Sequence, residues 1–154
     1  MTDEKKPLLA VRDLKVYYPI KVRSRGIFSQ KKLVRAVDGI SFDVYEGETL
    51  GIVGESGCGK STTGKTIVRL NRPTAGSVTY DGMDLFSCPP QAQARISREI
   101  QIVFQDPYSS LDPRFTVGRS IAEPLVVHKA GAPAERRARV VELMRAVGLR
   151  EDVY

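Results

Sequence analysis

The sequence predicts an α/β fold built around a phosphate-binding loop, with an antiparallel β layer in front of the loop and helices behind it. Three observations support this prediction. Residues 54–61 (Gly-Glu-Ser-Gly-Cys-Gly-Lys-Ser) match the pattern G-x-x-x-x-G-K-[ST] in full, between a short apolar run at 49–53 and a helix-like segment at 61–70. Two segments with strand-like alternation, 8–18 and 34–44, precede the loop. From about residue 117 onward the pattern is helical.

Length and composition fit one globular domain. The chain has 154 residues, of which 42% are hydrophobic and 27% charged. No apolar run approaches the roughly 18 residues that a membrane span needs, and the N-terminal residues hold no apolar signal core, so we expect a cytosolic location. The two cysteines, Cys58 and Cys88, are too few for a disulfide framework or a four-ligand zinc site.

The net charge of +6 is concentrated near the N-terminus. Residues 1–35 carry ten Lys or Arg and three Asp or Glu, whereas the rest of the chain is almost neutral. A solvated surface loop is the first interpretation of this cluster, and a position near a membrane is the second. Nucleic acid comes third, because no aromatic pattern for base recognition accompanies the charge, and we expect no nucleic-acid partner.

The segments in front of the phosphate loop are predicted to be strands joined by a long connection. The segment 8–18 is rich in Val and Tyr and should form a strand that ends at Pro19. The segment 20–35 is basic and has no period, so we expect a long loop there. The segment 34–44 alternates again and should be a second strand, and the turn at 46–48 leads into the strand of the phosphate loop.

The residue types in the loop suit an anionic ligand. Gly54, Gly57 and Gly59 lack a Cβ, so the backbone can take conformations with positive φ and point its N–H groups at an anion. The helix that follows adds its positive N-terminal end. Lys60 can reach the outer phosphates of a nucleotide, and the Ser61 hydroxyl can ligate the accompanying Mg²⁺. We therefore expect a nucleoside triphosphate; the pattern alone does not decide between ATP and GTP, and a glycine-rich turn beside a solvated lysine is the alternative.

Cys58 lies inside this loop, just before the N-terminus of the helix, where the pKa of a thiol tends to fall. The first interpretation is a small residue that fills the loop. The second is a thiol whose alkylation blocks nucleotide binding, and protection by nucleotide against a maleimide would test it.

Behind the loop helix, chain breakers at 71–76 separate it from further short elements. The predicted elements are a strand at 77–80, a helix from 87–90 to about residue 99, and an apolar strand at 100–104 that ends at Gln105, followed by a turn-rich segment at 106–114.

The C-terminal part is predicted to hold two helices. Segment 117–128 contains Pro124, which should kink or divide it. Segment 134–147 should end at Gly148, with Met144 as a core residue. His128, the only histidine, should lie at the surface or cap a helix rather than serve a metal or catalysis. The expected apolar stripe of the second helix consists of Ala138, Val140, Val141, Met144 and Val147.

Taken together, these features resemble the ATP-binding subunit of an ABC transporter, and within that family the oligopeptide/dipeptide importer group. Three stretches carry the likeness, which covers nearly the whole chain: 36–42 (Ala-Val-Asp-Gly-Ile-Ser-Phe), 51–62 (Gly-Ile-Val-Gly-Glu-Ser-Gly-Cys-Gly-Lys-Ser-Thr) and 103–114 (Val-Phe-Gln-Asp-Pro-Tyr-Ser-Ser-Leu-Asp-Pro-Arg). The phosphate loop in the second stretch indicates nucleotide binding in general, and the third stretch, around Gln105, is much more specific to this group. The resemblance implies a P-loop NTPase fold of ABC type with an incomplete sheet. It further implies an ATP-binding core with its β layer at 1–105 and the start of a helical subdomain at 106–154.

The resemblance also implies residue roles, with ATP and Mg²⁺ as cofactors. Tyr18 looks like the aromatic residue on which the adenine stacks, with Tyr17 as its rival. Gln105 matches the glutamine that reaches Mg²⁺ and the attacking water, so it is the candidate catalytic residue and, with Ser61, a candidate metal ligand; alternatively it only closes a strand. The candidate phosphate-binding residues are Gly54, Glu55, Ser56, Gly57, Cys58, Gly59, Lys60, Ser61 and Thr62.

The family places a Leu-Ser-Gly-Gly-Gln-like signature, an apolar strand ending in Asp-Glu and a switch histidine downstream of a segment like 145–149, and this sequence ends at Tyr154. We therefore expect a fragment with weak nucleotide binding, negligible turnover and exposed apolar surface. The resemblance implies transmembrane permease subunits as partners, a second ATP-binding subunit in the full-length form, and a peripheral position on the inner face of the cell membrane.

The leading hypothesis is a subunit that couples ATP to the uptake of oligopeptides or dipeptides. A small P-loop kinase or GTPase is the first alternative, disfavoured because such folds usually begin with the strand of the phosphate loop. A noncatalytic fragment that binds nucleotide or a partner is the second. Because peptide specificity rests on the resemblance alone, nickel and other solutes stay open.

Overall fold

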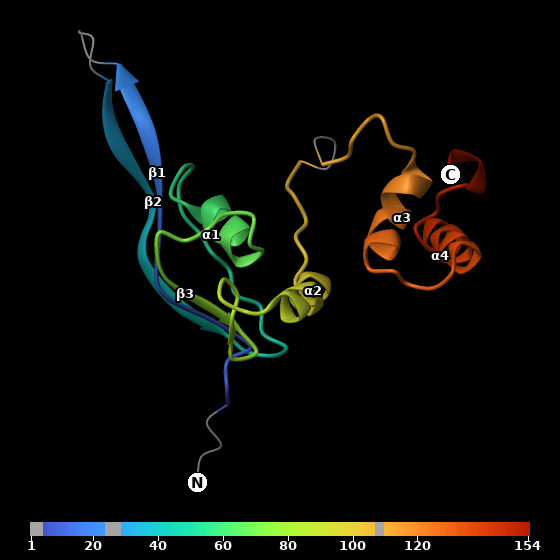
Figure 1. Ribbon diagram of the computed structural model, residues 1–154, viewed down its shortest axis with the longest axis horizontal. Helices are drawn as coiled ribbons and strands as arrows, with labels where there is room; N and C mark the ends of the chain where they lie inside the picture. Colours follow the sequence, from blue (N-terminus) through green and yellow to red (C-terminus); the bar gives the residue numbers. More distant parts are fainter. Residues whose placement is uncertain (1–4, 24–28, 107–109) are drawn as a thin grey trace. The chain divides into compact units, whose positions relative to one another are not determined.

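The computed structural model describes residues 5–23, 29–106 and 110–154, and the chain divides into two compact units, Met1–Ile102 and Val103–Tyr154 (Figure 1). Both units together give the predicted combination of an antiparallel sheet and helices. The first unit contains β1 (Leu9–Arg23), β2 (Ser29–Val44), α1 (Lys60–Ile67), β3 (Ala75–Tyr80), β4 (Met83–Asp84) and α2 (Pro90–Glu99). The second contains α3 (Val117–Val127), α4 (Pro133–Ala146) and the 3₁₀ helix η1 (Glu151–Val153).

The sheet of the first unit has the order β2-β1-β3-β4, and all of its pairs are antiparallel. β1 pairs with β2 from Leu9 opposite Val44 to Arg23 opposite Ser29, interrupted by three irregularities in register. β3 accompanies β1 only as far as Lys15, which lies opposite Ala75. Beyond that point β1 and β2 continue as a two-stranded ribbon (Figure 1).

The long loop predicted at 20–35 and the strand end predicted at Pro19 are wrong. β1 continues through Pro19 to Arg23, and β2 already begins at Ser29, so most of the expected loop is a β-hairpin. Proline has no N–H to donate, and strands tolerate it where one edge has no partner. That condition holds at Pro19, because only β2 pairs with this part of β1. Residues 24–28 of the predicted loop lie outside the described residues.

The strands predicted at 49–53 and 100–104 are also wrong. Both runs are irregular, and within the described part of the chain neither pairs with another strand. Val53 is 94% exposed and Val103 is 96% exposed. A strand needs a hydrogen-bonded neighbour as well as apolar residues, so strand-like composition alone does not form a ladder. The expected exposed apolar surface is present at these two runs.

The core of the first unit lies between the sheet and the segments that contain α1 and α2. Alternate side chains of β1, β2 and β3 point into this core from the sheet. Residues in and just before α2 pack against them from the other side. Its buried members are Val11, Leu14, Val16, Val37, Val78, Leu85, Cys88 and Ile96.

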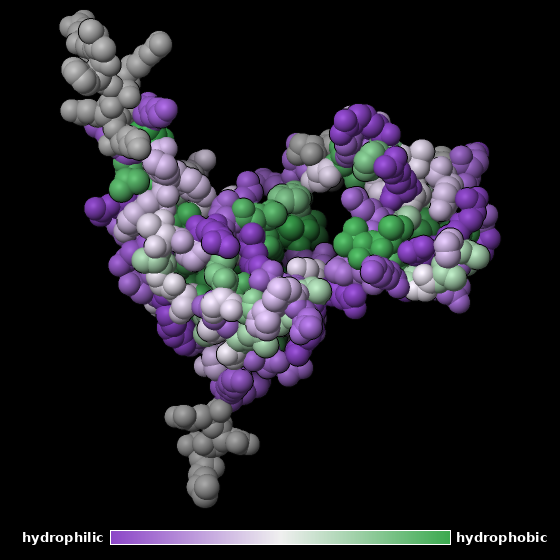
Figure 2. All heavy atoms as spheres, in the orientation of Figure 1, coloured by the Kyte–Doolittle hydropathy of each residue, from purple (hydrophilic) through white to green (hydrophobic). Residues whose placement is uncertain are grey.

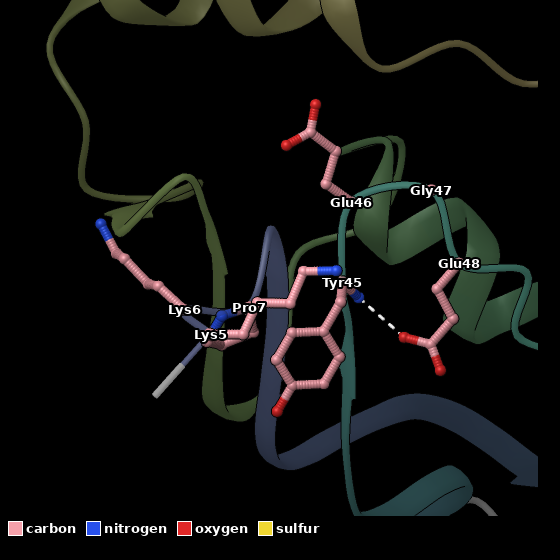
Figure 3. A pocket seen from close by; sticks show the side chains of 7 residues that line it. All are labelled: Lys5, Lys6, Pro7, Tyr45, Glu46, Gly47 and Glu48. Atoms are coloured by element: carbon pink, nitrogen blue, oxygen red, sulfur yellow. Dashed lines mark hydrogen bonds between the residues drawn. The ribbon is translucent and has the colours of Figure 1, made fainter. Parts of the chain in front are cut away.

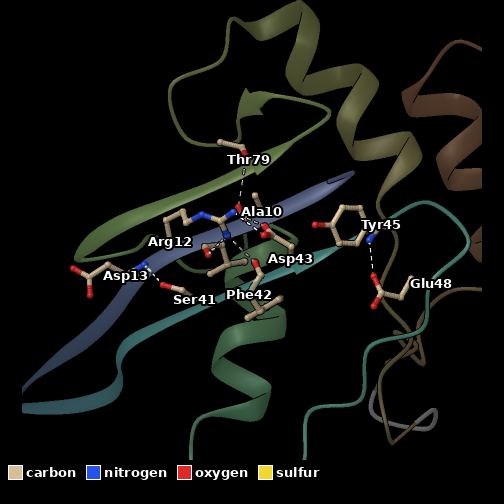
Figure 4. Close-up of polar contacts among 10 residues, drawn as sticks. Ala10, Arg12, Asp13, Ser41, Phe42, Asp43, Tyr45, Glu48 and Thr79 are labelled. Atoms are coloured by element: carbon tan, nitrogen blue, oxygen red, sulfur yellow. Dashed lines mark hydrogen bonds and ion pairs between the residues drawn. The ribbon is translucent and has the colours of Figure 1, made fainter. Parts of the chain in front are cut away.

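Polar contacts tie the strands together at their exposed positions (Figure 4). The Arg12 guanidinium on β1 lies 2.6 Å from the Asp43 carboxylate on β2 and donates to the Phe42 carbonyl at 3.2 Å. The backbone N–H of Asp13 donates to the Ser41 hydroxyl at 2.8 Å. These contacts fix the register of β1 against β2 next to its first irregularity.

In the second unit, α3 and α4 pack around Val140 and Met144, which are fully buried; this confirms the core role of Met144. α4 ends as predicted, because the N–H of Gly148 donates to the Arg145 carbonyl and the N–H of Leu149 donates to the Met144 carbonyl. The apolar stripe was predicted too broadly, since Ala138 and Val147 are exposed.

Two predictions about α3, for Pro124 and for His128, can be compared with the structure. The helix is not divided at Pro124 but ends at Val127, and His128 caps it, as expected for this histidine. At its start, the Thr116 hydroxyl accepts a hydrogen bond from the N–H of Arg119. Among the described residues, no helix is both long enough and apolar enough to cross a membrane.

Candidate functional site

The phosphate-loop motif occupies the connection that leads into α1, and two of its glycines have the predicted left-handed backbone. Gly57 has a φ of 83°, and Gly59, the N-cap of α1, has a φ of 97°. A Cβ on Gly59 would lie 2.3 Å from the Ala36 carbonyl oxygen of β2, so the loop packs against this strand without room for a side chain. A Cβ on Gly54 would lie 2.6 Å from the Cys58 sulfur, so a side chain there would require the Cys58 side chain to move.

The Lys60 ammonium lies inside the loop. Its Nζ donates to the carbonyl oxygens of Gly54 and Glu55, each at 2.7 Å, and lies 3.5 Å from the Cys58 sulfur. The lysine therefore bridges the two ends of the motif and holds a full positive charge at its centre. The Cys58 side chain is exposed yet fills the space beside Gly54, which agrees with its interpretation as a loop filler.

The N-terminus of α1 presents backbone donors at the same place. The first main-chain bond of the helix runs from the Thr63 N–H to the Gly59 carbonyl, at 2.9 Å. The N–H groups of Ser61 and Thr62, which precede it, have no acceptor inside the helix. These donors carry the positive end of the helix dipole, so an anion is favoured here. The Ser61 side chain is exposed at this end of the helix.

Sequence reasoning missed two buried threonines of α1. Among the described residues of the first unit, Thr63 and Thr66 are the buried polar ones, and their hydroxyls donate to the carbonyls of Gly59 at 3.1 Å and Thr62 at 2.8 Å. Burial without a partner would be costly, and these bonds to the preceding turn remove that cost. The three-residue spacing of the two threonines was the available signal, since it places both on one helix face.

Tyr17 and Tyr18 lie next to each other in β1 but differ in their surroundings. Tyr17 donates its phenol hydrogen to the Asp38 carboxylate, and its ring lies 5.6 Å from the Arg35 guanidinium. This hydrogen bond raises the pKa of Tyr17 above its ordinary value and lowers the pKa of Asp38. Tyr18 is 39% exposed.

Strand alternation places Tyr18 on the same face of the sheet as the phosphate loop. The Val37 side chain contacts the loop, with its Cγ2 3.3 Å from the Cβ position of Gly59, and Val16 lies opposite Val37. The register irregularity between Val16 and Tyr17 adds a residue, Ala36, to β2 and none to β1. Successive side chains of β1 therefore still point to opposite faces, with Tyr17 on the far face and Tyr18 on the face that carries the loop.

The structure places Gln105 in the second unit, where it is exposed. Pro107, Tyr108 and Ser109, which belong to the motif around Gln105, lie outside the described residues. The role of Gln105 in metal binding and catalysis stays a prediction. Among the described residues, no group of three or more His, Cys, Asp or Glu could hold a metal ion by itself.

A separate hollow of about 830 Å³ lies beside the turn after β2 (Figure 3). It contains none of the predicted site residues. The turn that borders it is closed by a hydrogen bond from the Tyr45 N–H to the Glu48 carboxylate, at 2.8 Å. Two lysines and two glutamates are among the residues that line the hollow, which are Lys5, Lys6, Pro7, Tyr45, Glu46, Gly47 and Glu48.

Comparison with known proteins gives a family and several relatives. The family model described as ABC transporter matches residues 37–153. The chain is 45% identical over 148 residues to "Dipeptide transport ATP-binding protein DppF" of Escherichia coli (strain K12), an alignment that covers 96% of this chain and 43% of the relative. It is 46% identical over 147 residues to "Putative oligopeptide transport ATP-binding protein YkfD" of Bacillus subtilis (strain 168), covering 95% of this chain and 42% of the relative. The chain thus spans less than half the length of these relatives.

Solved structures of ABC cassettes share the fold. The dimeric structure of a post-hydrolysis state of the ATP-binding cassette MJ0796, bound to ADP and Pi, matches with a TM-score of 0.69 at 26% identity and covers 94% of this chain and 59% of that chain. CbiO1 from Clostridium perfringens, part of the ABC transporter complex cbiONQ, matches with a TM-score of 0.62 at 25% identity and covers 96% of this chain and 52% of that chain.

Proposed function

The chain belongs to the ABC transporter family, and from this premise we propose that it is the ATP-binding part of an importer that takes up dipeptides or oligopeptides. The observation that carries the proposal is the phosphate loop at the start of α1, in a sequence about 45% identical to ATP-binding proteins named for dipeptide transport. The match of residues 37–153 to the ABC transporter family argues against the alternative of a small P-loop kinase or GTPase.

The loop fits the phosphates of ATP. Positive φ at Gly57 and Gly59, the N–H groups of Ser61 and Thr62, and the Lys60 ammonium together offer several donors within one short segment. We propose that residues 54–62 bind the phosphates and that Lys60 exchanges its two carbonyl acceptors for phosphate oxygens. This exchange replaces neutral carbonyl acceptors with anionic phosphate oxygens, so both partners of each hydrogen bond are charged and the bound state is favoured.

Mg²⁺ would bind next to the phosphates. Because the described residues offer no acidic cluster for a metal, and Mg²⁺ usually combines one or two protein oxygens with phosphates and water, the exposed Ser61 hydroxyl fits as a ligand. A bound Mg²⁺ would neutralise charge on the phosphate oxygens. We propose Gln105 as the second metal contact and as the residue that orients the attacking water.

The adenine would stack on Tyr18. This residue is exposed on the face of the sheet that carries the loop, whereas the hydroxyl of Tyr17 is engaged by Asp38 on the opposite face. The structure thus supports Tyr18 over its neighbour as the proposed stacking residue.

The remaining assignments extend the same proposal. We propose residues 1–105 as the ATP-binding core and 106–154 as the start of a helical subdomain. The proposed partners are the permease subunits of the importer and a second ATP-binding subunit, at the inner face of the cell membrane. The names of relatives support this assignment, since they describe ATP-binding proteins of peptide transport.

Growth on peptides tests this proposal in the native cell. A strain that needs one amino acid is supplied with it either as a dipeptide or in free form. A chromosomal Lys60→Ala substitution should abolish growth on the dipeptide and leave growth on the free amino acid intact, because only peptide uptake depends on the loop. Lys129→Gln, a change at an exposed position of the second unit, is the matched control.

Two outcomes would contradict the proposal. Equal growth of wild type and Lys60→Ala on the dipeptide would exclude a role of the loop in peptide uptake. A growth defect that appears only when a metal ion or another solute is limiting would assign the importer to that solute.

A further inference from the structure

The ends of β1 and β2 that extend past β3 form a feature that nucleotide binding does not explain. We call residues 19–23 and 29–34 the basic ribbon. Its register runs from Pro19 opposite Leu33 to Arg23 opposite Ser29, and β3 no longer pairs beyond Lys15 (Figure 1). A two-stranded ribbon by itself is marginally stable in water, so a surface that covers it would stabilise it.

The charge of the basic ribbon is one-sided. Residues 16–34 contain five Lys or Arg and no Asp or Glu. Lys21 and Lys32 are exposed, and neither forms an ion pair with any described carboxylate. By contrast, Lys15 and Arg35, just outside the ribbon, are paired with Asp13 and Asp38. The ribbon therefore carries positive charge that the described part of the chain does not neutralise.

Large aliphatic side chains are exposed among these charges. Leu33 is 64% exposed, and Ile20 and Val34 are 42% and 44% exposed. Ile20 lies opposite Lys32, and Val34 lies two pairs further along, opposite Tyr18 on the same face, whereas Leu33 points to the other face. Figure 2 shows hydrophobic and hydrophilic residues side by side at this end of the hairpin. Both faces thus combine aliphatic groups with nearby cations.

This combination favours a bilayer over other anionic partners. Cations bind headgroup phosphates, and aliphatic side chains gain by entering the boundary between headgroups and acyl chains. Nucleic acid would use the cations but not the aliphatic groups, and the described residues of the ribbon include no aromatic ring for base stacking.

We propose that the basic ribbon binds directly to a membrane surface rich in anionic phospholipid. Lys21 and Lys32 contact the headgroup phosphates, and Ile20 and Leu33 enter the interface, whereas Val34 lies opposite Tyr18 and is left out of this contact. This contact goes beyond the proposed nucleotide site and requires neither nucleotide nor a permease subunit.

Co-sedimentation of the 154-residue chain with lipid vesicles tests the proposal without nucleotide. Vesicles of phosphatidylcholine with 30 mol% phosphatidylglycerol are compared with vesicles of phosphatidylcholine alone. The chain should bind the anionic vesicles, and added salt should weaken the binding. Replacing both Lys21→Gln and Lys32→Gln should lower the partition coefficient about 25-fold, since each interfacial cation contributes about fivefold.

The control pair Lys65→Gln and Lys129→Gln removes the same charge from exposed positions outside the ribbon and should change binding less than about twofold. Leu33→Ser, which keeps the net charge, should lower binding about fivefold through the lost apolar contact. All these positions are exposed, so the midpoint of urea unfolding should be unchanged in every variant.

The proposal would be overturned if the chain did not bind the anionic vesicles, or if the two double variants lost binding equally, which would indicate attraction by net charge alone. It would also be overturned if Leu33→Ser bound as the wild type does. That result would show that the ribbon recognises polyanions in general, as a surface for nucleic acid or for an acidic protein would.

Discussion

Tyr17 and Tyr18 are neighbours in β1, but their side chains point to opposite faces of the sheet and have different surroundings. Tyr17 is fixed by its hydrogen bond to Asp38 and by the Arg35 guanidinium over its ring, so it fastens β1 to β2. Tyr18, one position later, points to the opposite face of the sheet and is exposed. The sequence left both tyrosines as candidates for the adenine contact, because alternation fixes which residues share a face but not which face carries the loop.

Substitution of these tyrosines separates the two roles. Tyr18→Ala should weaken ATP binding about fivefold, because a stacked aromatic ring contributes on the order of 1 kcal/mol. Tyr18→Trp should retain the affinity, and Tyr17→Phe should leave it unchanged while it removes the bond to Asp38. Titration with a fluorescent ATP analogue measures all three. Loss of binding in Tyr17→Phe, with normal binding in Tyr18→Ala, would reverse the assignment.

At the scale of elements, the phosphate loop and α1 depend on how closely they approach β2. The contact between Gly59 and the Ala36 carbonyl leaves no space for a Cβ, and the buried hydroxyls of Thr63 and Thr66 donate to carbonyls of the preceding turn. The same helix contains Gly64, around which no atom lies within 4 Å of a Cβ position. These two glycines therefore form a matched pair for a test of the packing.

Gly59→Ala should lower the free energy of unfolding by about 1–3 kcal/mol, because alanine is strained at a φ of 97° and its Cβ would overlap the Ala36 carbonyl. Gly64→Ala should raise it by about 0.5–1 kcal/mol through higher helix propensity. Urea unfolding followed by circular dichroism gives both values. A stability in Gly59→Ala equal to that of the wild type would show that the loop does not pack on β2 in this way.

Helices, whose hydrogen bonds join residues close in sequence, were predictable from the sequence. Several strands were predicted wrongly, because a strand depends on a partner that is distant in sequence. Helices were predicted at 61–70, 87–99 and 134–147, and the structure has α1 at Lys60–Ile67, α2 at Pro90–Glu99 and α4 at Pro133–Ala146. The apolar runs at 49–53 and 100–104 have strand composition but no paired neighbour in the described chain. The hairpin beyond Pro19 was missed because proline and a run of cations indicate a loop unless the register with the second strand is known.

The same distinction applies to the candidate site. The residue types of the phosphate loop were readable because the motif is continuous, and the left-handed backbone at Gly57 and Gly59 agrees with it. The contact of Gly59 with Ala36 joins residues far apart in sequence, so no local pattern could reveal it. The buried hydroxyls of Thr63 and Thr66 were missed because burial depends on the packing of α1 against the sheet.

At the scale of the whole molecule, this member of the ABC transporter family combines a loop suited to phosphate with a ribbon suited to an anionic surface. The loop lies at the N-terminus of α1, and the ribbon lies at the far ends of β1 and β2, so the two features use different parts of the same sheet unit. Substitutions in one feature should therefore leave the other intact, and their tests are independent.

Equilibrium binding of ATP with Mg²⁺ to the 154-residue chain tests the central claim most directly. The account predicts saturable binding of a fluorescent ATP analogue that weakens at least about tenfold in Lys60→Ala, because the charged hydrogen bonds of the ammonium to the phosphates are lost. Lys65→Ala, which removes a lysine from the last turn of the same helix, should bind as the wild type does. Equal binding by wild type and Lys60→Ala, or no saturable binding by the wild type, would contradict the assignment of this loop as the phosphate site.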